Sequence, residues 1–189
     1  MRRQSIRVAT ARLLETVPYY ELTLEAITDA VGLPTSVFYH YFPSKRALLL
    51  DLIDELFAEF RREMGRAGPY ESLEVGVAHN NRLILRMYRD HTGLMRCLAQ
   101  VDELALAARW REHLFGWRQV VGASLREYAD PGTSQCELDA LAHTLSGVTE
   151  SFAREYFVER NVRLLDAFPD TERAADFLTA IWIRTILLT

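Results

Sequence analysis

The sequence is poor in the residues that build cross-linked or heavily turned folds. It has 2 cysteines, 6 prolines and 9 glycines among 189 residues. Cys97 and Cys136 are too few for a disulfide framework or a four-cysteine zinc site, and we expect both to be buried as small hydrophobic residues. The low proline and glycine content argues against collagen-like, linker-rich and many-turned all-β architectures.

Long hydrophobic runs are also missing. The most apolar tract, residues 177–189, has 13 residues and contains Arg184, so it is too short to span a bilayer. The first residues do not form the apolar segment that is typical of a secretion signal. The sequence therefore predicts a cytoplasmic protein.

The charge is divided unevenly along the chain. The formal net charge is −4, but residues 1–50 carry a net charge of +2 and the remainder carries −6. A basic N-terminal segment favours contact between this part of the chain and a polyanion. Hydrophobic residues make up 49% of the sequence, which is enough to form a core.

Apolar residues recur at steps of three and four, and no segment alternates with a period of two, so we expect an all-α fold. The first helix carries the stripe Ile6, Ala9, Leu13 and Val17. Thr23 is the expected N-cap of a second helix, whose apolar face is Ala26, Ile27, Ala30 and Val31. A turn at Gly32 leads to a short helix over 35–41, and a long helix runs from Ser44 to Met64.

The remaining helices are expected near 70–90, 92–100, 102–129, 134–160 and 170–188. These ranges predict a three-helix head over residues 1–50 and a larger helical body over residues 51–189.

A capped helix, a glycine turn and a short second helix form the helix-turn-helix pattern, whose second helix lies in the DNA major groove. On a period of 3.6 residues, Phe38 and either Tyr41 or Phe42 point inward. The residues left facing a ligand are Thr35, Ser36, Val37, Tyr39 and His40. Hydroxyl and imidazole groups can bind phosphates or base edges, and a valine methyl can contact a thymine methyl.

Residues 22–33 and 38–49 closely resemble the DNA-binding head of TetR-type transcriptional regulators, and the run Tyr-His-Tyr-Phe-Pro-Ser-Lys over residues 39–45 is the most specific part. The resemblance implies that Tyr39 and Lys45 hold phosphates. It also implies a repressor whose body binds a small effector, and whose last two helices pair with those of a second subunit. The predicted DNA-binding residues are Thr23, Thr35, Ser36, Val37, Tyr39, His40 and Lys45.

Three positions depart from the family pattern. Thr28 replaces a usual alanine, Ser36 replaces a glycine or another small residue, and Pro18 replaces a glycine before Tyr19. The first two substitutions keep the side chain small, so we expect the head to fold.

Candidate residues in the body are less specific, because each aromatic residue could equally be part of a plain core. The predicted effector-binding residues are Tyr88, Trp110, Trp117, Phe152 and Tyr156, which suit an apolar or aromatic effector. The predicted dimer-interface residues are Leu145, Phe152, Phe177, Ile181 and Trp182, on an apolar face that must be covered. Asp139, His143 and Glu150 lie near one helix face, but a surface or pocket-lining group is a better interpretation than a metal site.

The sequence thus predicts a homodimeric, ligand-responsive repressor that binds a palindromic DNA operator. We expect no enzyme activity, cofactor, metal or membrane partner. Alternatives are a DNA-binding regulator without an effector and an all-helical enzyme or lipid carrier.

Overall fold

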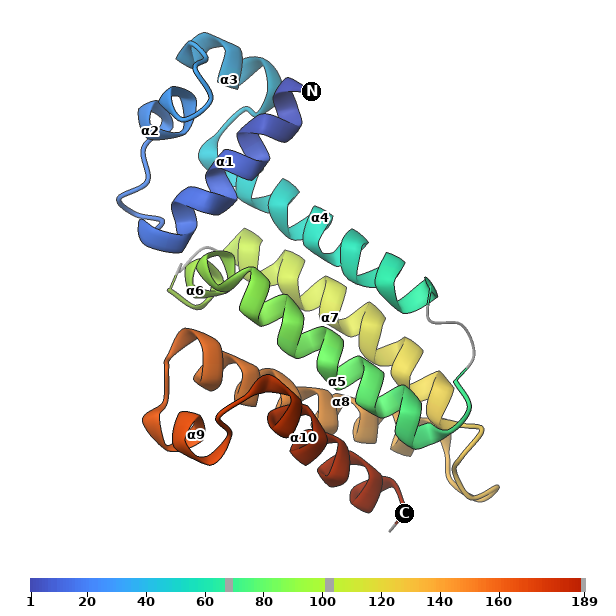
Figure 1. The fold of residues 1–189 in the computed structure, drawn as a ribbon. Coiled ribbons are helices and arrows are strands. Elements are labelled where there is room, and N and C mark those ends of the chain that lie inside the picture. Colours follow the sequence, from blue (N-terminus) through green and yellow to red (C-terminus); the bar gives the residue numbers. More distant parts are fainter. Residues whose placement is uncertain (67–69, 101–103, 188–189) are drawn as a thin grey trace. The chain divides into compact units, whose positions relative to one another are not determined.

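The computed structural model describes residues 1–66, 70–100 and 104–187, and all regular secondary structure in these ranges is helical (Figure 1). The elements are α1 (Arg2–Thr16), α2 (Leu24–Asp29), α3 (Thr35–Tyr41), α4 (Lys45–Arg66), α5 (Leu73–Asp90), α6 (Thr92–Gln100), α7 (Leu104–Leu125), α8 (Gln135–Ala153), a π-helix η1 (Arg154–Val158), α9 (Val162–Ala167) and α10 (Thr171–Ile186). The all-α prediction is confirmed. Among the described helices, none is long and apolar enough to cross a membrane.

The chain forms two compact units. The first unit contains residues 1–59 and 91–111, and the second contains residues 60–90 and 112–189. Helices α4 and α7 contribute residues to both units. The unit that includes α1, α2 and α3 is therefore larger than the 50-residue head.

The first helix of the head buries a face one residue away from the expected stripe. Ile6, Thr10 and Leu14 are buried, at a regular spacing of four residues. The predicted members Ala9, Leu13 and Val17 are only half-buried. The difference has a structural cause: α1 packs against both α2 and α6, and the contact with α6 is tertiary and is not marked by any local pattern.

The turn between α2 and α3 is built as the sequence predicts. The Thr23 side chain accepts a hydrogen bond from the Ala26 amide at 3.1 Å, which caps α2. Gly32 has φ +63°, a conformation that glycine adopts without strain. Ala30 belongs to this turn and is exposed, which corrects its predicted place on the buried face. Thr28 is buried, and its hydroxyl donates to the Glu25 carbonyl at 3.1 Å.

In the second unit, α5 lies against α10 and against α8, as Figure 1 shows. The α8 helix begins with a capping box: the Ser134 side chain accepts from the Glu137 amide, and the Glu137 carboxylate accepts from the Ser134 amide. The main core cluster of this unit consists of Val77, Val121, Leu125, Leu138, Ala142, Leu145, Trp182 and Ile186.

The C-terminal half differs most from the predicted helix ranges. The expected helix 134–160 is α8 followed by the π-helix η1, and the chain then turns at Arg160, which has φ 55°. The short helix α9 was not predicted. Its N-cap, Asn161, also donates to the Glu155 carboxylate at 2.7 Å, so the break is held by local side-chain contacts. Helix α7 ends at Leu125 and not at residue 129, and residues 102 and 103 lie outside the described ranges.

Candidate functional site

One side of helix α3 packs against the rest of the head, and the opposite side is exposed to solvent. Phe38 and Phe42 are 0% and 2% exposed, so the predicted inward face is confirmed, with Phe42 as its second member. On the outward side Ser36 and His40 are exposed, Thr35 and Val37 are half-buried, and the Tyr39 side chain is 54% exposed. Five predicted DNA-binding residues therefore share one short helix and reach the surface together.

These side chains offer hydrogen-bond donors that suit a nucleic acid. The Tyr39 and Ser36 hydroxyls can donate to phosphate oxygens or base edges, and His40 can donate or accept. The His40 ring packs edge-on against the neighbouring Tyr41 ring, with centroids 5.1 Å apart. Thr23 is exposed, and its oxygen is already the acceptor that caps α2. Its hydroxyl hydrogen is the group that a phosphate could engage.

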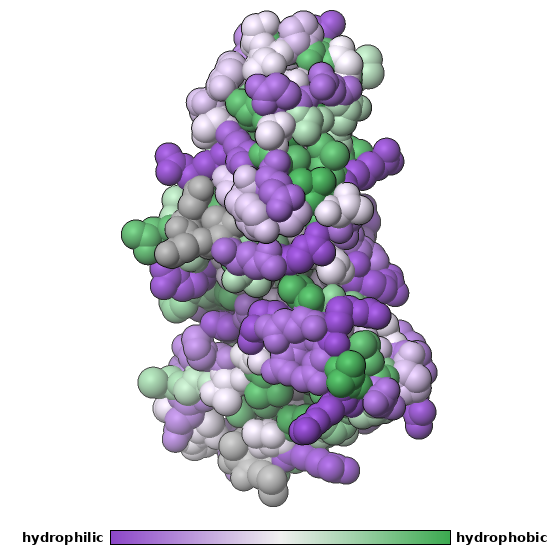
Figure 2. All heavy atoms as spheres, turned by 90° about the vertical axis from the view of Figure 1, so that its left-hand side faces the viewer, coloured by the Kyte–Doolittle hydropathy of each residue, from purple (hydrophilic) through white to green (hydrophobic). Residues whose placement is uncertain are grey.

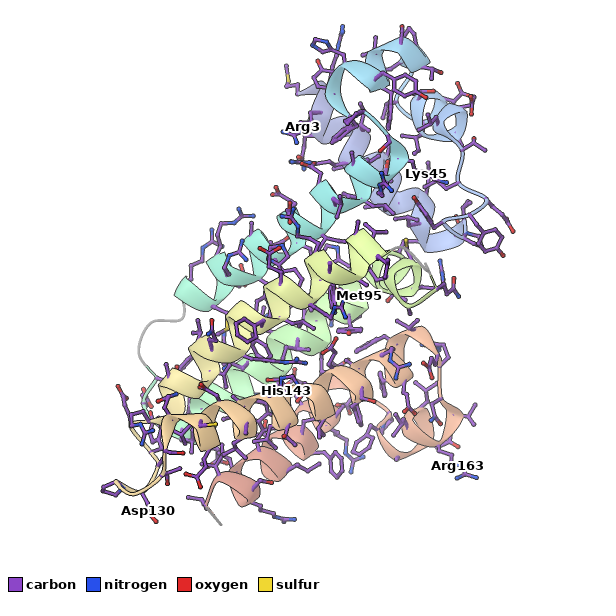
Figure 3. All side chains as sticks on the ribbon, turned by 180° about the vertical axis from the view of Figure 1, so that it is seen from behind. Arg3, Lys45, Met95, Asp130, His143 and Arg163 are labelled. Carbon is purple, nitrogen blue, oxygen red and sulfur yellow. The ribbon has the colours of Figure 1, made fainter. Side chains whose placement is uncertain are left out.

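Lys45 has hydrogen-bond partners within the protein. Its ammonium group donates to the Tyr19 carbonyl at 2.8 Å and to the Leu22 carbonyl at 2.7 Å. It also lies 4.2 Å from the centroid of the Tyr19 ring. Lys45 is placed at the start of α4, inside the head (Figure 3). It therefore ties α4 to the segment between α1 and α2, and its contact with phosphate stays a prediction.

Arg46 is a candidate that the sequence reasoning missed. It is exposed, and it follows Lys45 in the first turn of the 22-residue helix α4. The preceding residue Ser44 accepts a hydrogen bond from the Ala47 amide at 3.1 Å. A guanidinium beside a capped helix start is a suitable phosphate ligand. The signal that could have identified it was the pair of consecutive basic residues at this helix start.

The C-terminal end of α1 is held by α6 within the first unit. The Arg96 guanidinium donates to the carbonyls of Leu14 and Glu15, at 2.5 and 2.8 Å. The Gly93 amide donates to the Glu15 carboxylate at 2.9 Å. A Cβ atom at Gly93 would lie only 2.4 Å from the Leu14 carbonyl carbon, so α6 approaches the α1 backbone directly. A displacement of α6 must therefore move α1 or break these contacts.

The predicted effector-binding residues take part in separate contacts. Trp110 packs edge-on against Phe57 in the first unit, at 4.9 Å between ring centroids. Trp117 packs against Phe60 in the second unit, at 5.8 Å. Phe152 and Tyr156 stack on one another at 5.8 Å. Tyr88 is 4% exposed, and burial raises the pKa of its phenol well above the ordinary value.

A pocket of about 290 Å³ lies in the second unit, lined mainly by α5 and α7. Trp182 of α10 and Tyr70, which precedes α5, also line it. None of the five predicted effector-binding residues lines this pocket. Its size is at the lower end of the range for small-molecule sites.

The predicted dimer-interface residues are divided between the core and the surface. Leu145 and Trp182 are each 3% exposed and belong to the core cluster of the second unit. Phe177 is 44% exposed, and Phe152 and Ile181 are half-buried. The last three share the surface of α8 and α10 with Leu141 and Val148. Apolar side chains form separate patches among hydrophilic ones on the face drawn in Figure 2.

His143 and Glu150 of α8 share an arginine partner. The Arg118 guanidinium is 3.2 Å from the His143 Nδ1 atom and donates to the Glu150 carboxylate at 3.1 Å. Figure 3 shows His143 on the side of α8 that faces α7. Asp139 instead accepts from Gln135 at 2.8 Å. These contacts favour a pairing of α7 with α8 over a metal site.

Part of the chain matches one family model, and the whole chain is similar to curated transcriptional regulators. Residues 6–52 match the bacterial regulatory proteins of the tetR family. Over 97% of its length the chain is 28% identical to the HTH-type transcriptional regulator EthR of Mycolicibacterium smegmatis, covering 86% of that protein. It is 23% identical to EthR of Mycobacterium tuberculosis, covering 98% of this chain and 87% of that protein.

Solved structures share the fold. The transcriptional regulator FadR from Bacillus subtilis, in complex with stearoyl-CoA, superposes with a TM-score of 0.78 at 14% identity. The alignment covers 95% of this chain and 96% of that one. A transcriptional regulator from Rhodococcus sp. also gives a TM-score of 0.78 at 14% identity, covering 98% and 97% of the two chains.

Proposed function

The chain belongs to the TetR family of bacterial transcriptional regulators, and on this premise we propose that it represses genes by binding a two-fold symmetric DNA operator as a homodimer. A small molecule that binds the second unit releases it from the operator. The protein acts in the cytoplasm, where bacterial DNA lies. Its activity is regulatory and not enzymatic. The named relatives, which are transcriptional regulators, support this proposal.

The observation that carries the proposal is the two-sided structure of α3. The buried Phe38 and Phe42 fix the helix to the head, and Ser36, Tyr39 and His40 stand on its exposed side. A helix held in this way after a glycine turn is the recognition helix of a helix-turn-helix unit. Tyr39 and Arg46 supply phosphate contacts, and the affinity should therefore fall steeply with salt.

The two-fold symmetry of the proposed operator follows from the proposed homodimer. A two-fold axis relating two heads requires two half-sites with matching symmetry. We propose that the interface is formed by the outward sides of α8 and α10, with Phe152, Phe177 and Ile181 at its centre. The buried Leu145 and Trp182 support this surface from within the protomer.

Release requires the effector to bind one conformation better than another. The chain passes between the two units within α4, within α7 and between α5 and α6, so these segments carry any signal along the chain. Because Gly93 and Arg96 contact the end of α1, a movement of α6 would displace α1 and so change the head. The FadR structure, which holds stearoyl-CoA, supports the expectation that a body of this fold can hold a small molecule.

The proposal is tested by selecting sheared genomic DNA of the source organism on the purified protein, followed by sequencing. The expected result is an enriched two-fold symmetric motif whose recovery falls as salt is raised. A Tyr39→Ala variant, which removes an exposed side chain and leaves the core intact, is the matched control and should not enrich the motif. Equal enrichment by the variant, or no motif from the folded dimeric protein, would contradict the proposal.

A further inference from the structure

The pocket of the second unit is apolar at its base. Val77, Leu125 and Trp182 line it and are 6%, 3% and 3% exposed. Glu127 and Tyr128, which are exposed, lie at its rim. A pocket of about 290 Å³ with such a base can take a small ring or a short aliphatic group.

Two polar atoms at this pocket are buried and have no hydrogen-bond partner among the described residues. They are the hydroxyl of Tyr70 and the amide oxygen Oδ1 of Asn80. The neighbouring Asn81, by contrast, bonds to Thr149 and Thr179 through both ends of its amide. An unpaired buried polar group destabilises the fold, so its persistence in a pocket wall points to a partner that is not part of the protein.

The Tyr70 ring is held in place by α5. A Cβ atom at Gly76 would lie 2.9 Å from the Tyr70 Cδ2 atom, so the ring rests directly on the helix at this glycine. The His79 ring packs against Tyr70 at 5.5 Å between centroids. Burial raises the pKa of the Tyr70 phenol, which keeps the hydroxyl protonated and able to donate. Two residues that line one pocket thus carry an unpaired donor, the Tyr70 hydroxyl, and an unpaired acceptor, Asn80 Oδ1.

The described residues that line the pocket provide no cationic partner for an anion. Of the lining residues that the structure describes, Glu127 alone carries a charge, and it is acidic. Among these described residues, a carboxylate or phosphate would find no cation. The exposed position of Glu127 leaves its attraction for a cation screened by solvent.

From these observations we infer that this pocket binds an uncharged, largely apolar ligand that accepts a hydrogen bond from Tyr70 and donates one to Asn80, as a carboxamide does. The inference deepens and rests on the proposed function, because it names the chemical class of the effector.

The ligand class is tested with four probes that share a benzene ring and differ in one group: benzamide, benzoate, benzylamine and ethylbenzene. Each is titrated into the full chain without DNA, and binding is followed by amide chemical shifts in NMR spectra. Benzamide is expected to bind with a Kd of about 1 mM, as suits a fragment of its size, and roughly tenfold more tightly than the other three. Equal or tighter binding of benzoate, benzylamine or ethylbenzene would overturn the inference.

Two variants separate a ligand site from a structural role. Tyr70→Phe and Asn80→Leu each remove an unpaired polar atom, so each should raise the melting temperature of the empty protein by about 2–4 °C. Each should also weaken benzamide binding at least about fivefold, as expected for one lost hydrogen bond. Tyr20→Phe, at a side chain that is 77% exposed, is the matched control and should change neither quantity.

Variants that lower the melting temperature and leave benzamide binding unchanged would assign both residues to the fold and overturn the inference. Because no DNA is present, failure here leaves the proposed DNA binding untouched. Failure of the operator selection, in turn, does not alter the affinities of the four probes.

Discussion

The indole N–H of Trp182 donates to the Thr149 hydroxyl oxygen, 2.9 Å away, inside the second unit. The Thr149 hydroxyl in turn donates to the amide oxygen of Asn81 at 3.1 Å, and the Asn81 amide nitrogen donates to Thr179 at 3.2 Å. The chain of bonds joins α8, α10 and α5 through side chains that are all buried. Because each donor finds an acceptor, this network fixes the register of the three helices.

Replacing Thr149 with valine keeps the volume and removes the central hydroxyl. The Trp182 N–H and the Asn81 oxygen then lose their partner, and the free energy of unfolding should fall by about 3 kcal/mol. Urea unfolding followed by tryptophan fluorescence measures the change. Thr144→Val is the control, because Thr144 lies on the same helix but is exposed and donates to the Ala140 carbonyl of its own helix. A similar loss in both variants would show that the network has no special effect.

Substitution of Lys45 should lower the stability of the fold, whereas substitution of Arg46 should weaken DNA binding. Lys45→Ala removes the donor to two carbonyls and should lower the free energy of unfolding by about 2 kcal/mol. Arg46→Ala removes an exposed guanidinium, and it should weaken DNA binding for all sequences with little change in melting temperature. Fluorescence anisotropy with operator and with random DNA makes the comparison. If Arg46→Ala leaves both affinities unchanged, Arg46 does not contact phosphate.

Gly93→Ala should disturb the contact between α6 and α1. The added methyl group would lie 2.5 Å or less from three backbone atoms of Leu14 and Glu15, so one of the two helices must shift. We expect a melting temperature at least about 4 °C lower and altered operator affinity. Gly116→Ala is the control, since no atom lies within 4 Å of its added methyl group. That change should stabilise α7 by about 0.5–1 kcal/mol.

Phe177→Arg should weaken the dimer and leave the protomer folded, because this side chain is 44% exposed on α10. Sedimentation velocity over a range of protein concentrations measures the shift toward monomers. Val162→Arg, at an exposed position of α9, is the matched control. Dimers of undiminished stability in the Phe177 variant would place the interface elsewhere on the chain.

Glu137 should make stability depend on pH at the start of α8. Hydrogen bonds from the Ser134 amide and hydroxyl lower the pKa of Glu137 below its ordinary value of 4.5. Since the folded-state pKa is the lower one, the stabilisation is present above about pH 4.5 and is lost as the pH falls through the folded-state pKa. The melting temperature of Glu137→Gln should therefore fall less steeply below that pH than that of the wild type. Parallel pH profiles would contradict this role.

The head was largely predictable because its signals are local. Thr23, Gly32 and the spacing of Phe38 and Phe42 each mark a cap, a turn or a buried position by their own chemistry. The buried face of α1 was misplaced by one residue because it depends on α6, which lies more than 75 residues further along the chain.

The body was less predictable because its determinants are tertiary. The break after η1 contains neither glycine nor proline. It is marked by the positive φ of Arg160, a conformation that the residue type does not predict. The large aromatic residues that were predicted to bind the effector do not line the pocket. Tyr70 and Asn80 do, and their unpaired atoms are visible only in the three-dimensional structure.

Lys45 is the chain's one lysine, and its amine already donates to two carbonyl oxygens. Acylation of this amine removes its positive charge and breaks both hydrogen bonds to the segment between α1 and α2. A dye or a sensor surface coupled to Lys45 is therefore attached within the unit that contains the recognition helix. DNA-binding measurements on this protein should accordingly use attachment through a thiol. Cys97 is buried as predicted, but Cys136 is exposed, which corrects its predicted burial, and it offers a thiol in the second unit.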